Sequence, residues 1–154
     1  MEQIICKPLR IMTINEIQDE IIEEFDGLTD WMDRYAYIIE LGEGLTPFPE
    51  SDKTPANLIE GCQSRVWITA RQTSTGNVIF QADSDALIVK GIVALLLRVL
   101  SDHTPREILD ADLYFIDRIG LKEHLSPTRS NGLVAMVRQM KNYALAFQAL
   151  SEQA

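Results

Sequence analysis

The sequence contains few of the side chains from which metal and nucleophile sites are usually built. It has two cysteines, Cys6 and Cys62, and two histidines, His103 and His124, among 154 residues. These four share no paired spacing, so no metal site is expected. In the reducing compartment expected for this chain, two cysteines 56 positions apart predict no disulfide framework and are expected to be free thiols. Both histidines flank expected helices, where capping or packing roles are more usual than ligation.

Nucleotide motifs and long apolar runs are also missing. The Gly42-Glu43-Gly44 segment lacks the third glycine of a dinucleotide fingerprint, and there is no phosphate-binding loop. The most apolar stretch, residues 86–100, contains Lys90 and Arg98 and is shorter than the ~20 residues of a membrane span. The first residues do not resemble a secretory leader, so a reducing cytoplasmic location is expected.

Positive charge is scarce, and its distribution is uneven. The net charge is −9, which disfavours nucleic acid and anionic membranes as partners. Residues 1–60 contain 14 acidic and 4 basic side chains, whereas residues 61–154 contain 9 and 10. The acidic part is either an ordinary solvated face or a surface that steers a basic partner.

Hydrophobic periodicity predicts helices on both sides of a small sheet. Thr13 and Glu16 form a capping-box pattern before a helix over residues 14–25. Thr29 or Asp30 is expected to cap a second helix over 31–41, with Gly42 as its stop. A Gly- and Pro-rich loop then covers residues 42–57.

Alternating apolar residues predict strands over 64–71 and 77–82, joined by a hairpin turn at 74–76, with a short third strand over 57–59. Trp67 is expected to pack in the core. Ser84 is expected to cap a buried central helix over 85–100, with Asp83 and Asp85 at its positive end. A short helix is expected to start at residues 104–107, and further helices are expected at 112–119 and 130–149. This order predicts a single α+β domain, with about three antiparallel strands packed against several helices.

Cys62 is the residue that stands out chemically. It follows Gly61 at the junction of the loop and the first strand, where a thiol can be presented to another protein. The sequence around it also permits a buried thiol that acts only as a small apolar filler. As a nucleophile, the thiol would need a positive neighbour or help from a partner.

Four motifs in one order resemble the SufE family. They are YIIELG at 37–42, GCQSRVW at 61–67, DSDALIVKG at 83–91 and LSPTRSNG at 125–132. The likeness covers residues 14–150 of one domain, 1–154, with residues 1–12 and Cys6 as an additional N-terminal segment. Glu60, Thr128 and Asn131 are variants beside the motifs, and they bear on the choice of partner.

The resemblance implies an IscU-like fold and a sulfur acceptor that holds a persulfide on Cys62. It implies a cysteine desulfurase of the SufS or CsdA type as donor and an iron–sulfur assembly complex of the SufBCD type as recipient. No resident cofactor is implied, because pyridoxal phosphate belongs to the desulfurase. The family pattern gives Arg129 a role in stabilising the thiolate or the loop, and Asp85 a role in the loop or in partner contact. A salt bridge and a helix-end acid are the structural alternatives for these two residues.

Three functions are compatible with these features. In the first, the chain carries sulfur as a sulfurtransferase-like partner of the desulfurase. In the second, it activates a desulfurase allosterically without carrying sulfur. In the third, it uses Cys62 in redox chemistry. No activating base lies near Cys62 in the sequence, which disfavours the third. A homodimer is compatible with the sequence, and cluster assembly on this chain is disfavoured because it has too few cysteines.

Overall fold

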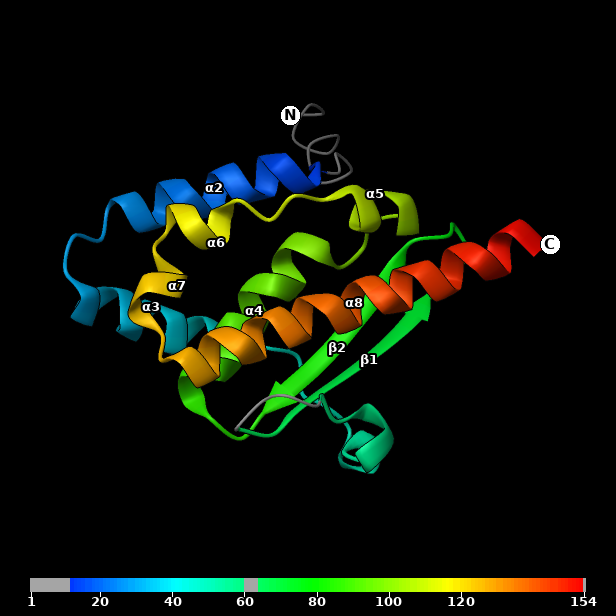
Figure 1. The fold of residues 1–154 in the computed structure, drawn as a ribbon, viewed down its shortest axis with the longest axis horizontal. Coiled ribbons are helices and arrows are strands. Elements are labelled where there is room, and N and C mark those ends of the chain that lie inside the picture. Colours follow the sequence, from blue (N-terminus) through cyan, green and yellow to red (C-terminus); the bar gives the residue numbers. More distant parts are fainter. Residues whose placement is uncertain (1–11, 60–63, 154) are drawn as a thin grey trace, which may run out of the picture.

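The computed structural model describes residues 12–59 and 64–153, and these form an α+β fold around one central helix (Figure 1). That helix, α4 (Leu87–Leu100), contacts α2, α3, β2 and α8. Eight of its fourteen residues are buried. The predicted central buried helix and the α+β class are therefore both confirmed. No helix in the described part of the chain is long and apolar enough to cross a membrane.

The two N-terminal helices begin where their capping residues predict. In α2 (Ile14–Asp26), the Thr13 hydroxyl accepts the Glu16 N–H, and the Glu16 carboxylate accepts the Thr13 N–H. In α3 (Trp31–Glu43), Asp30 rather than Thr29 is the N-cap. Both caps satisfy N–H groups that have no partner inside the helix.

Gly42 does not end α3, contrary to the prediction, because it is a contact point between helices. The helix continues to Glu43, and Gly44 follows it. A Cβ atom on Gly42 would lie 2.8 Å from the Gly91 nitrogen in α4. A Cβ atom on Gly91 would lie 2.0 Å from the Ile38 carbonyl oxygen. The two glycines let α3 and α4 approach more closely than any side chain would allow.

The sheet in the described residues is one antiparallel pair, β1 (Val66–Gln72) and β2 (Val78–Ser84). Its register pairs Val66 with Ser84 at one end and Gln72 with Val78 at the other. Alternate residues of β2 are buried, as the period of two requires. The predicted third strand is reduced to a single bridge between Leu58 and Trp67.

The predicted Ser84 cap is wrong. Ser84 is the last residue of β2, and the N-cap position of α4 is Ala86. The Ser84 hydroxyl still accepts the Ala86 N–H, at 3.3 Å. The strand therefore extends further than its apolar alternation indicates, and a two-residue bend separates it from α4.

The C-terminal half contains α5 (Pro105–Asp110), α6 (Phe115–Arg118), α7 (Leu121–His124) and α8 (Pro127–Gln153). Thr104 and Glu107 form a second capping box at α5. The predicted helix over 112–119 is shorter in the structure, α7 was not predicted, and α8 is longer than its predicted range. Figure 1 shows α8 running across the molecule in front of α4 and the strands, with α2 and α6 on the opposite side of α4.

Two polar side chains hold α2 to the C-terminal half. Gln18 is fully buried; its amide donates to the Asp112 carbonyl at 3.0 Å and accepts the Phe115 N–H at 3.1 Å. The Arg34 guanidinium donates to carbonyl oxygens at the ends of α2 and α6, including that of Ile119. Because buried amides and carbonyls need partners, these contacts fix where α6 lies against α2.

Candidate functional site

The candidate site is the junction where β1 begins, which we call the Cys62 junction. Its described residues are Leu58 and Ile59 on one side and Ser64–Trp67 with Asp83–Ala86 on the other. Cys62 itself lies in residues 60–63, outside the described residues, as does Cys6. The site is therefore described through the two flanking groups of residues, which we call its N-terminal and C-terminal anchors.

The N-terminal anchor is a piece of antiparallel pairing against β1. The Ile59 N–H donates to the Val66 carbonyl at 2.8 Å, and Leu58 forms the isolated bridge with Trp67. Ile59 is buried with the main core. The chain before the Cys62 segment is thus fixed by a backbone hydrogen bond and by burial of one apolar side chain.

The C-terminal anchor depends on Asp85. Its carboxylate Oδ1 accepts the Arg65 N–H at 3.0 Å, and its own N–H donates to the Arg65 carbonyl at 3.3 Å. These contacts extend the β1–β2 pairing past the last strand pair, Val66 and Ser84. Asp85, whose side chain is exposed, therefore holds the backbone of Arg65 just before β1. Its role in the loop or in partner contact stays a prediction.

A charge cluster centred on Asp83 lies beside the two anchors. Its carboxylate oxygens lie 3.2 Å from Lys53 Nζ and 3.3 Å from Lys90 Nζ. Burial would raise the pKa of Asp83, but the Ser84 N–H and the two ammonium groups outweigh it and lower that pKa. Asp83 is therefore ionised at neutral pH and joins three segments of the chain.

Lys53 connects the loop before the junction to the sheet. It follows the short 3₁₀ helix η2 (Glu50–Asp52), pairs with Glu50 at 2.8 Å, and lies 5.3 Å from the centre of the Trp67 ring. Hydrogen bonds to Glu50 and Asp83 raise the pKa of Lys53. Trp67 is 9% exposed, which confirms its predicted packing role. Nothing in the sequence marked Lys53, because its partner Asp83 is thirty residues away.

A hollow of about 420 Å³ opens next to Ile59, between α8 and the second 3₁₀ helix, η3 (Pro55–Asn57). Its lining consists of Pro55, Ala56, Leu58, Ile59, Ala135, Arg138 and Gln139. Arg129, the other residue singled out from the sequence, lies in the first turn of α8. Its role at the thiol stays a prediction.

The two histidines have packing roles, as expected. The His103 ring is buried, and its nitrogens lie 3.1 Å and 3.0 Å from the carbonyl oxygens of Ser101 and Met12. The His124 ring stacks on Trp31 with the ring centres 3.7 Å apart. Within residues 12–59 and 64–153, no group of three or more potential ligand side chains could hold a metal ion.

These features define a class of protein: a small α+β domain in which the residues on both sides of the Cys62 segment are fixed, Ile59 to β1 and Arg65 to Asp85 before the central helix. A family model described as "SufE: Fe-S metabolism associated domain" matches residues 19–144, which include Cys62, Asp85 and Arg129. The chain therefore belongs to the SufE family and is associated with iron–sulfur metabolism.

A solved structure with the same fold is described as the solution structure of a hypothetical protein from Thermus thermophilus. It superimposes with a TM-score of 0.71 at 21% sequence identity, covering 86% of this chain and 96% of the other. At this identity the likeness supports the fold. The roles of individual residues depend on the family motifs.

Proposed function

We propose that this protein accepts sulfur from a cysteine desulfurase onto Cys62 and passes it to an iron–sulfur cluster assembly complex. The observation that carries the proposal is the family match over residues 19–144, a range that contains Cys62 and its GCQSRVW motif. The anchored junction around this segment supports it, because a carrier thiol needs a defined position on the surface that meets its partner.

The transfer is an exchange at sulfur. The Cys62 thiolate attacks the terminal sulfur of the persulfide on the desulfurase. A new S–S bond forms on Cys62 as the donor S–S bond breaks, and the desulfurase cysteine leaves as a thiolate. No external oxidant or reductant is consumed. Pyridoxal phosphate, which releases sulfur from free cysteine, remains in the desulfurase.

The junction offers a way to present the thiol without disturbing the core. Three residue steps separate Cys62 from Ile59 and three separate it from Arg65, and three steps span at most about 11 Å. A partner that reaches Cys62 must therefore approach the end of the sheet, where Asp85, Lys53 and Asp83 lie. Partner contacts with this end would help to select the desulfurase.

Mass spectrometry of the intact protein tests the proposal. The chain is incubated with a cysteine desulfurase and free cysteine, alongside the Cys62→Ser variant and a matched Cys6→Ser control. We expect a gain of one sulfur, about 32 mass units, in the wild type and the control but not in Cys62→Ser.

Desulfurase turnover measured in the same samples separates carrying from activation. A carrier loses its stimulation of sulfide release with Cys62→Ser but still binds the enzyme. If Cys62→Ser stimulates fully and no sulfur is gained, the chain is an allosteric activator and the carrier proposal is wrong. Peroxide consumption without any desulfurase would instead indicate redox chemistry at Cys62.

A further inference from the structure

Helix α8 differs in charge from the rest of the protein. Between Pro127 and Ser151 it contains no acidic residue, although the chain has 23 acidic and 14 basic side chains in total. Its charged residues in that range are Arg129, Arg138 and Lys141. A long surface helix usually carries charges of both signs on its solvent side.

The exposed side of α8 carries apolar side chains in place of the missing charges. Val134 is 45% exposed and Leu145 is 56% exposed. Eleven residues make about three helical turns, so these two side chains project from the same side of the helix. Arg138, one turn after Val134, is also exposed.

A groove of about 360 Å³ runs along this stripe, between α8 and the segment that contains α6. Ile116 and Leu133 form a buried floor, while Leu113, Val134 and Val137 remain partly open. The exposed stripe and the groove therefore form one continuous surface. We call it the α8 surface.

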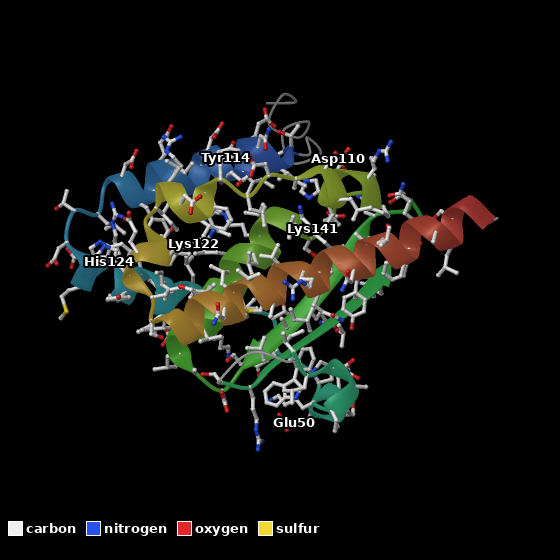
Figure 2. All side chains as sticks on the ribbon, viewed as in Figure 1. Glu50, Asp110, Tyr114, Lys122, His124 and Lys141 are labelled. Carbon is white, nitrogen blue, oxygen red and sulfur yellow. The ribbon has the colours of Figure 1, made fainter. Side chains whose placement is uncertain are left out.

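The charges around the groove leave a net positive rim. Figure 2 labels Lys122 and Lys141, which lie in the space between α8 and the segment of α5 to α7. Lys141 Nζ donates to the Ala111 carbonyl at 2.7 Å, and Lys122 lies 3.8 Å from the Asp117 carboxylate. The Arg138 guanidinium has no hydrogen bond or ion pair within the described part of the chain. Asp112 also lines the groove, so the rim has three basic and two acidic residues.

We infer that the α8 surface binds an acidic amphipathic helix of a partner protein. Apolar side chains of that helix would enter the groove beside Val134 and Val137, and a carboxylate would pair with Arg138. A helix laid in an apolar groove and recognised by flanking charges is a common mode of protein recognition. A second copy of this chain fits less well, because both copies would present the same rim of three basic and two acidic residues.

The probe is a labelled 21-residue synthetic peptide with leucines at helical spacing and glutamates on the flanking positions. A second peptide has every glutamate replaced by lysine. We expect the acidic peptide to bind the full chain with a Kd below ~1 mM by fluorescence anisotropy, and the basic peptide not to bind. NMR shifts on binding should appear at the methyl groups of Val134, Val137 and Leu113.

Arg138→Glu should weaken this binding by about fivefold or more, and Val134→Asp should weaken it similarly. The control is Arg106→Glu on α5, an exposed arginine outside the groove, which should leave binding unchanged. Equal binding of both peptides, no binding at about 1 mM, or no effect of Arg138→Glu would overturn the inference. A concentration-dependent dimer that Arg138→Glu abolishes would assign the surface to a second copy and also overturn it. Cys62→Ser should not alter binding, so this test is independent of sulfur transfer.

Discussion

A single substitution at Asp85 tests whether the Cys62 junction matters for stability and for sulfur loading. The Asp85 carboxylate accepts the Arg65 N–H, so Asp85→Ala removes the acceptor and leaves that N–H to solvent. We expect a loss of about 1 kcal/mol in the free energy of unfolding and slower sulfur loading of Cys62. Asp85→Asn retains an oxygen acceptor and should restore most of the loading rate.

Denaturant unfolding and time-resolved mass spectrometry measure the two effects of Asp85→Ala. The matched control is Asp110→Ala, which removes an exposed acid paired with Arg106 on α5. If Asp85→Ala loads sulfur at the wild-type rate, Asp85 stabilises the strand end without positioning the acceptor segment. A loss shared equally with Asp85→Asn would indicate that the negative charge, rather than the hydrogen bond, is what matters.

Glu24 gives the fold a dependence on pH that can be assigned to one carboxylate. The Arg98 guanidinium donates to both of its oxygens, and with the Tyr37 hydroxyl this lowers the pKa of Glu24 despite burial. A lowered folded-state pKa contributes stability that is complete above the unfolded value of about 4.3 and is lost as pH falls through the folded value.

Glu24→Gln should therefore lose less stability than the wild type as the pH falls below about 4.5. At neutral pH it should lower the free energy of unfolding by about 1 kcal/mol. The loss is small because the Glu24 side chain is about a third exposed. Urea unfolding at several pH values measures this. Glu23→Gln, at an exposed neighbour on the same helix, is the control. Parallel pH profiles for wild type and Glu24→Gln would contradict the assignment to Glu24.

At the scale of elements, the crossing of α3 and α4 depends on two glycines that belong to the family motifs. Gly91→Ala would place a methyl group 2.0 Å from the Ile38 carbonyl oxygen, so the helices must separate. We expect a loss of about 3 kcal/mol in the free energy of unfolding, measured by denaturant titration. Gly27→Ala, whose Cβ would meet its nearest neighbour at 3.7 Å, should be nearly neutral. Equal stability of the two variants would show that the crossing adapts.

The helices and strands were largely predictable because their signals are local. The capping boxes at Thr13 and Thr104 and the alternation in β2 each lie within a few residues. Gly42 was misjudged because a glycine that ends a helix and one that admits a neighbouring helix look the same in sequence. The third strand was over-predicted because strand pairing depends on neighbours that a short apolar run does not specify.

The site was predictable only in part, for the same reason. The motif identified Asp85, which contacts Arg65 across twenty residues. Lys53 and Gln18 went unnoticed, because an isolated polar residue carries no signal until the fold supplies Asp83 or Phe115 as its partner. Cys62 was found from the motif, and its role stays a prediction.

At the scale of the whole molecule, acidic and basic side chains are unevenly distributed along the chain. The excess acid lies in residues 1–60, whereas α8 carries no acid before Glu152. If the acidic helices α2 and α3 steer a basic desulfurase surface, their charges should act on the association rate more than on the dissociation rate. This contribution should be screened within about 10 Å at 0.1 M salt.

The test is a triple variant, Glu23→Gln, Asp26→Asn and Glu40→Gln, at three exposed acids of α2 and α3. No ion pair joins these three to another described residue, so the fold should be unaffected. At about 50 mM salt we expect association with the desulfurase, followed by stopped-flow fluorescence, to slow about threefold. At about 500 mM salt the variant and wild type should associate equally fast, because the charges are screened. A faster variant would mean that the acidic part repels the enzyme. An unchanged rate at low salt would mean that these acids are a solvated face turned away from the docking site.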